Sequence, residues 1–178
     1  MTAAALLLLP CATARAACAP PSFEAALAEP AASDIFLAPG AATCTNLEVE
    51  VAAHAISGLF TVSFDLRYPS AILKYEGKTP GPLMRQGSPK TAPVFLVQNP
   101  EPGILIVTLT RFAHDGAATA TASEALMTFH FSRAGAGSGM IDFDTGPSST
   151  IAEKILDENG LVRPARFGPG HGGVIRSP

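Results

Sequence analysis

The alternation of apolar and polar side chains is clearest in residues 59–68, LFTVSFDLRY. Every second residue from Phe60 to Tyr68 is apolar, and the residues between them are polar or charged. Because a β-strand projects successive side chains to opposite faces, this period of two predicts a strand with one buried and one outward face. The sequence LEVEV at 47–51 alternates in the same way and predicts another strand.

Turn-forming residues divide the rest of the chain into further short segments. Gly and Pro occur 16 times each, and Pro69 ends the strand before it because proline cannot donate to a strand ladder. The further segments that read as strands are AILKYE, PVFLVQN, ILIVTLTRF, ALMTFHFS, MIDF, a stretch around Ile155, and GGVIRS. We predict loops for residues 79–90 and 114–123. About nine strands without a long amphipathic helix predict an all-β, antiparallel β-sandwich with jelly-roll topology.

The N-terminal residues have the features of an export signal. Residues 1–16 contain an apolar run that ends in Ala14-Arg15-Ala16, the small-x-small pattern that a signal peptidase accepts. We expect a signal peptide at 1–16 and a periplasmic or extracellular protein; a buried N-terminal strand or helix is the alternative. Residues 17–33 are rich in Ala and Pro and predict a tether with a helical turn beginning at Ser22, and residues 34–178 predict the folded domain.

The cysteines fit this interpretation. Removal of residues 1–16 eliminates Cys11 and leaves Cys18 and Cys44, and an even pair in an oxidising compartment predicts one disulfide. The alternative is that Cys11 or Cys18 is a lipid-modified first residue, which would attach the protein to the cell envelope.

Composition narrows the function classes. A chain of 178 residues with 47% hydrophobic residues is long and apolar enough for one domain with a core. The formal net charge is −3, and the 12 Lys and Arg residues form no cluster, so nucleic acid is excluded as an expected partner.

Catalytic and metal-binding patterns are weak. Asp144-Thr145-Gly146 matches the loop of aspartic proteases, but such an enzyme needs two carboxylates that share a proton, so a single copy requires a homodimer. We keep this protease as a minor alternative, because a turn after a strand explains the same residues. The four His residues lack metal-ligand spacing. We therefore expect no enzyme activity, no metal and no cofactor.

The order of the segments resembles that of the cohesin family, sandwich modules that are related to cellulose-binding modules and hold dockerin domains. The resemblance covers residues 34–175, and its carriers are LEVEVAA, GLFTVSFDLRYPSAILKYEGKTPG, GILIVTLTRF, EALMTFHFSRAGAGSG, ILDENG and GGVI. In the family, a strand that ends in Tyr-Asp-Pro precedes a short apolar strand and a Pro-Gly turn. Here Tyr68-Pro69, AILKY and Pro80-Gly81 occupy those places, without the Asp.

The resemblance implies a non-catalytic module that binds a dockerin-like protein through a sheet face. Polar side chains on the long third strand serve this role in the family, and Thr61 and Ser63 match those positions, where cellulosomal members carry Asn and Asp. Independently, Ile104 and Ile106 share a strand face opposite Leu105, and one of the two faces must point outward. We predict Thr61, Ser63, Ile104 and Ile106 as the partner-binding residues of a monomer.

Two other binding roles stay open. A carbohydrate-binding module associated with polysaccharide breakdown needs exposed aromatic rings, and the chain has no Trp and two Tyr. A structural subunit of the envelope would pair through a sheet edge.

Overall fold

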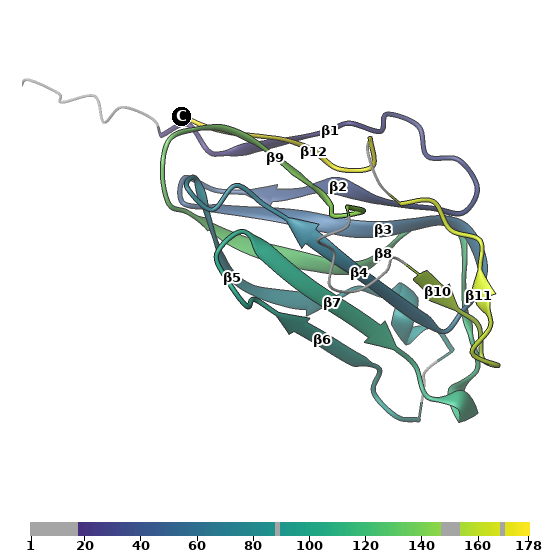
Figure 1. Cartoon of the computed structure of the whole chain (residues 1–178). Helices are drawn as coiled ribbons and strands as arrows, with labels where there is room; N and C mark the ends of the chain where they lie inside the picture. The colour runs from purple at the N-terminus through teal and green to yellow at the C-terminus, as the bar shows by residue number, and fades with distance from the viewer. Residues whose placement is uncertain (1–17, 88–89, 147–153, 168–169) are drawn as a thin grey trace, which may run out of the picture.

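The computed structural model describes residues 18–87, 90–146, 154–167 and 170–178. This part of the chain folds into two antiparallel sheets that pack face to face (Figure 1). The smaller sheet has the order β2-β3-β8-β5, formed by β2 (Asp34–Ala42), β3 (Asn46–Leu59), β8 (Ala118–Arg133) and β5 (Leu73–Pro80). The structure confirms the antiparallel sandwich that the alternation predicts.

The larger sheet has the order β1-β12-β9-β4-β10-β11, and β7 and β6 extend it from the other side of β4. Its strands are β1 (Ser22–Ala25), β12 (Gly173–Ser177), β9 (Gly137–Phe143), β4 (Thr61–Arg67), β10 (Lys154–Leu156), β11 (Val162–Arg163), β7 (Ile104–Thr110) and β6 (Val94–Gln98). Two 3₁₀ helices, η1 (Leu83–Arg85) and η2 (Ala113–Asp115), complete the described elements. None of the helices in the described ranges has the length and apolar character needed to cross a membrane.

Strand β4 is the centre of the larger sheet. It pairs along its whole length with β7, and its opposite edge is shared by β10 near Thr61 and by β9 near Arg67. Its residues Val62, Phe64 and Leu66 have no exposed surface. The predicted inward face of this segment is therefore confirmed, because the apolar side of β4 points into the core. On the opposite side of β4, Ser63 and Asp65 are also buried, at 3% and 1% exposed.

The core lies between the two sheets and contains side chains from almost every strand. Phe64 packs edge to face on Phe143 with ring centroids 5.2 Å apart, and Tyr68 contacts Phe131 at the same distance. From the smaller sheet, Leu47, Val49 and Val51 of β3 are buried as the alternation predicts.

Two predicted loops contain regular structure. Strand β8 begins at Ala118, inside the loop predicted for residues 114–123, because Ala118 and Ala120 pair with Leu59 and Ile56 of β3 and are buried. The loop predicted for residues 79–90 includes η1, whose Leu83 is fully buried. Small residues give little local signal for a strand, so pairing across the sheet decides their conformation.

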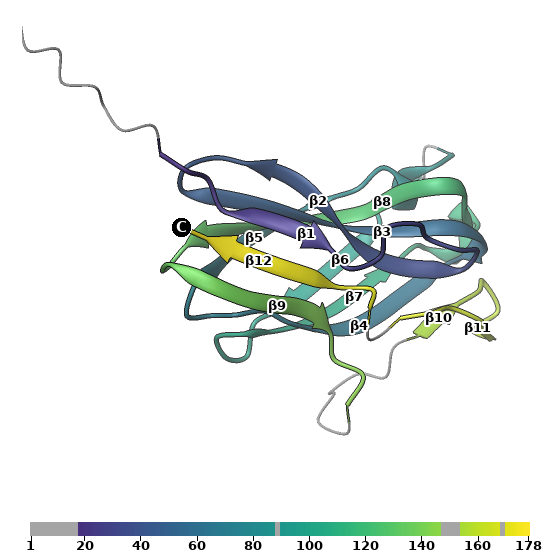
Figure 2. The ribbon, with the colours of Figure 1, turned by 90° about the horizontal axis from the view of Figure 1, so that it is seen from above.

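The helical turn predicted at Ser22 is wrong, because this segment is strand β1. Ser22–Ala25 pairs antiparallel with β12, and Phe23 is 8% exposed and packs into the core. Just before β1, Cys18 forms a disulfide with Cys44, with Cα atoms 5.7 Å apart. Figure 2 shows β1 and β12 side by side, with the C-terminus next to the start of β1.

A buried carboxylate joins the start of β2 to the C-terminal region. Asp34 is 2% exposed and accepts hydrogen bonds from the Ala31 backbone N–H (2.6 Å) and the Arg166 Nε (2.7 Å); His171 Nε2 lies 3.4 Å away. Burial alone would raise the pKa of Asp34, but these hydrogen bonds and positive charges together hold its pKa below the ordinary value.

Candidate functional site

The outer face of the larger sheet carries the residues that sequence analysis singled out. The register of β6, β7, β4, β10 and β11 aligns their outward side chains in rows that cross the strands. The first row is Val94, Thr110, Thr61, Leu156 and Val162; the second is Leu96, Thr108, Ser63 and Lys154. Five strands spaced by about 4.8 Å make the first row about 19 Å long.

Three of the four ends of these rows are apolar and exposed, and Lys154 is the fourth end. Val94 and Leu96 on β6 are 44% and 50% exposed, and Val162 on β11 is 70% exposed. Val94 and Leu96 lie side by side on β6, whereas Val162 lies at the other end of the first row. We define the docking face as the outer surface formed by these two rows together with Gln98, Ile106, Ile104 and Arg67.

Hydroxyl pairs occupy the middle of the docking face. Thr61 Oγ1 lies 2.8 Å from Thr110 Oγ1, and Ser63 Oγ lies 3.3 Å from Thr108 Oγ1. Such cross-strand hydrogen bonds fix the side-chain rotamers and give the face a rigid polar centre. Thr61 is half-buried, whereas Ser63 is only 3% exposed.

All four predicted residues lie on this one face. Thr61 and Ser63 belong to the first two rows, whereas Ile106 and Ile104 lie farther along β7, opposite Asp65 and Arg67 of β4. Both Ile residues are half-buried. The structure thus joins two separate predictions, one from a resemblance and one from strand alternation.

Sequence reasoning misses the exposed apolar members of the docking face, Val94, Leu96 and Val162. In β6 the apolar residues do not alternate with polar ones, so the pattern leaves the inward side undecided. The hairpin register decides it, because Phe95 and Val97 face the core with Leu109 and Val107 of β7. This register could have been read from the predicted hairpin.

An ion pair closes the other end of the docking face. Arg67 Nε and Nη2 each lie 2.7 Å from Asp144 Oδ2, and Asp144 is 9% exposed. Asp144 Oδ1 also accepts a hydrogen bond from the Gly146 backbone N–H at 3.2 Å. On the neighbouring Asp142, burial raises the pKa, although the Phe143 backbone hydrogen bond and the charge of His171 oppose it.

These contacts argue against the protease interpretation of Asp144-Thr145-Gly146. The proteolytic carboxylate must share a proton with a second carboxylate. Asp144 instead neutralises Arg67 and anchors the turn that follows β9. The described residues also contain no cluster of His, Cys, Asp and Glu able to hold a metal ion.

The aromatic residues do not form a sugar-binding platform in the described part of the chain. Tyr68 is 6% exposed, and Tyr75 packs on Phe129 and Phe131 with ring centroids about 6 Å apart. Phe112 is the exposed large aromatic residue within the described ranges, at 38%. A single ring offers no flat row for stacking on a polysaccharide.

No family model and no curated protein matches this sequence. Solved structures do match, and several are cohesins. A type II cohesin domain from the cellulosome of Acetivibrio cellulolyticus gives a TM-score of 0.59 at 14% identity, covering 80% of this chain and 93% of that chain. The chain has the cohesin fold.

Two further structures agree with this assignment. The sixth cohesin of scaffoldin B from Acetivibrio cellulolyticus, solved in complex with a dockerin, gives a TM-score of 0.54 at 16% identity and covers 80% of this chain and 92% of that chain. A non-cellulosomal cohesin from the archaeon Archaeoglobus fulgidus gives 0.52 at 16% identity, with coverage of 68% and 74%. The fold implied by the order of segments is confirmed, and identities this low concern the fold alone.

Proposed function

We propose that this chain is a non-catalytic recognition module that binds a partner protein through the docking face. The observation that carries the proposal is the pair of rows across β6, β7, β4 and β10, with exposed apolar side chains around hydrogen-bonded hydroxyls. Protein interfaces combine apolar anchors with polar groups that already have partners, and a flat sheet face offers both without reorganisation.

The proposed partner is a dockerin-like module. Cohesins of similar fold have been solved in complex with dockerins. Thr61 and Ser63 take the place of the polar residues that the cohesin resemblance assigns to recognition. Hydroxyl side chains are smaller than those of Asn and Asp, and unlike Asp they carry no charge. We therefore infer a contact that depends more on Val94, Leu96 and Val162 than on charge.

The proposal includes export to the periplasm or the extracellular space. The Cys18–Cys44 disulfide supports it, because such bonds persist in oxidising compartments. The predicted signal peptide at residues 1–16 lies outside the described residues.

The test is capture of the organism's own secreted proteins on the immobilised chain, in Ca²⁺ and again in EDTA, with measurement of the affinity for the purified captured protein. Dockerin modules fold around Ca²⁺, so a dockerin-like partner is lost in EDTA. Leu96→Glu should weaken the measured affinity at least tenfold, because it places a charge on β6, where the apolar side chains of Val94 and Leu96 are both exposed.

Met140→Glu is the matched control. Met140 is 60% exposed but lies on β9, across β7 and β4 from β6. Equal loss of binding in both variants, or binding unaffected by Leu96→Glu, would contradict the docking face. Capture of soluble glycans in place of a protein would favour the carbohydrate-binding alternative.

A further inference from the structure

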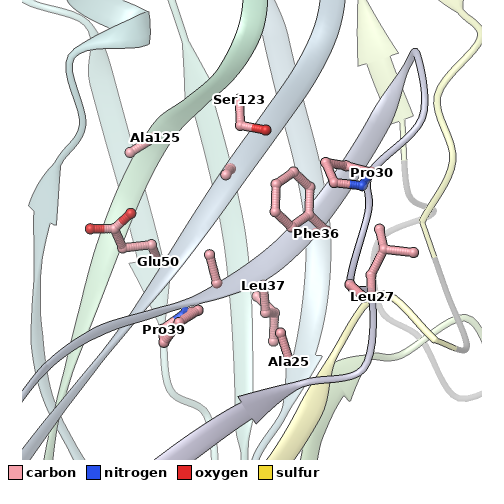
Figure 3. A pocket seen from close by; sticks show the side chains of 12 residues that line it. Ala25, Leu27, Pro30, Phe36, Leu37, Pro39, Glu50, Ser123 and Ala125 are labelled. Carbon is pink, nitrogen blue, oxygen red and sulfur yellow. The ribbon is translucent and has the colours of Figure 1, made fainter.

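A pocket of about 380 Å³ lies on the outer face of the smaller sheet (Figure 3). Phe36 and Ala125, from β2 and β8, line its sheet side, and Leu27 and Pro30 line it from the segment that follows β1. Sites for small organic molecules occupy about 300–1,000 Å³ and are mostly apolar with few polar groups. In size and lining, this pocket fits that description.

The wall made by residues 26–30 is held at both ends. Before it, the disulfide fixes Cys18 and the Ala26 backbone N–H donates to the Gly172 carbonyl oxygen at 2.9 Å. After it, Asp34 is anchored by Arg166. A wall fixed in this way needs little ordering when a ligand enters, so less binding free energy is lost.

The charge of the pocket comes from one carboxylate. Glu48 and Glu50 project from the same face of β3, but Glu48 is paired with His130 at 3.2 Å. Among the described residues, Glu50 has no hydrogen bond or ion pair, and the pocket lining contains no Lys, Arg or His. The Ser123 hydroxyl is already engaged by His54 Nδ1 at 2.9 Å.

We propose that this pocket binds a small organic amine, with a single ammonium group on an apolar body. Figure 3 shows Glu50 on the opposite side of the pocket from Leu27. The apolar body therefore packs against Phe36, Leu27 and Pro30, and the ammonium group pairs with the Glu50 carboxylate. Beside apolar walls this pairing is stronger than it would be in open water. The site lies on the other sheet from the docking face and does not depend on the proposed function.

Calorimetric titration of the purified chain with phenylbutylamine and with phenylbutanol tests the proposal, since the two probes share an apolar body. We expect saturable binding of the amine that is at least tenfold tighter than that of the alcohol, or about 1.4 kcal/mol. Glu50→Gln should abolish this preference, whereas the matched control Glu48→Gln should retain it. In NMR spectra, the amide signals of Phe36 and Ala125 should shift on titration.

Ala125→Leu provides a second variant, in which the larger side chain fills part of the pocket from its sheet side. It should weaken both probes at least tenfold without lowering the urea midpoint of unfolding. The proposal is overturned if the amine does not bind saturably, if it binds no tighter than the alcohol, or if the two Glu variants behave alike. A dimer that Ala125→Leu dissociates would assign the pocket to a second copy of the chain and would likewise overturn it.

Discussion

The side chain of Arg111 holds together two loops at one end of the sandwich. It is 3% exposed, and its guanidinium donates to four backbone carbonyls, those of Met84, Gln86, Asp115 and Gly116, at 2.8–3.0 Å. We predict that Arg111→Met, which keeps a long unbranched side chain, strongly destabilises the fold because it leaves these carbonyls without their donor.

The magnitude depends on the burial of the acceptors. The bond to Met84 is fully buried, and the other three are partly buried, so water can replace some of them. A buried polar group left unsatisfied costs about 1–3 kcal/mol, and a hydrogen bond to a charged group contributes about 1.5–3 kcal/mol. One fully buried and three partly buried hydrogen bonds of this kind together give an expected loss of about 3–5 kcal/mol in the free energy of unfolding. Arg111→Lys should recover little of it, because one ammonium cannot span four carbonyls.

Urea unfolding with the disulfide intact measures this loss, and hydrogen exchange at residues 84–86 and 115–116 should increase. Arg85→Met is the control, since the Arg85 side chain is exposed and its change should stay within about 0.5 kcal/mol. A loss below about 1 kcal/mol for Arg111→Met, or the same loss for Arg85→Met, would refute the reasoning.

Three further predictions concern the N-terminal strand and its surroundings. Replacing Cys18 and Cys44 by Ser should lower the free energy of unfolding by about 3–4 kcal/mol in urea titrations, because the disulfide closes a loop with a sequence separation of 26 and so reduces the chain entropy of the unfolded state. No change would show that the disulfide does not restrict the unfolded chain. Gly173→Ala places a Cβ against the Phe23 ring and the Glu24 carbonyl, so it should lower the free energy of unfolding by about 1–3 kcal/mol. It should also speed hydrogen exchange of the amides in β1, and unchanged exchange would contradict this prediction. The pKa of Asp34 is lowered in the folded state, so ionised Asp34 stabilises the fold fully above the ordinary pKa of 3.8, and this stabilisation is lost as the pH falls below that value. Asp34→Asn should therefore make the free energy of unfolding fall less steeply with decreasing pH in the acid range. An equally steep fall would exclude this role.

The sequence is most informative where polarity alternates and least informative where it does not. LEVEV and LFTVSFDLRY predict β3 and β4 with the correct inward face, because each strand has one apolar and one polar side. The first half of β8 reads as a loop, since its Ala and Thr residues carry no such signal and only pairing with β3 makes them a strand. Strand β1 escapes prediction because its partner β12 lies at the far end of the sequence.

The same distinction applies to the docking face. The outward direction of Thr61 and Ser63 follows from their apolar neighbours in β4, but the 3% exposure of Ser63 depends on what surrounds it in the folded sheet. Val162 joins the first row only because β11 pairs with β10. The sequence predicts a strand around Ile155, where β10 lies, but the two residues of β11 are too few to be recognised on their own.

The pairing of β1 with β12 also determines how the domain bears mechanical load. Ser22 pairs with Arg176, so the chain enters and leaves the domain at neighbouring points, and a force that pulls the two ends apart would open this strand pair one residue at a time (Figures 1 and 2). The disulfide changes the route of that force. A pulling force applied at Cys18 is transmitted through the disulfide to Cys44, in the connection between β2 and β3. It therefore acts on the smaller sheet before β1 has separated from the larger sheet.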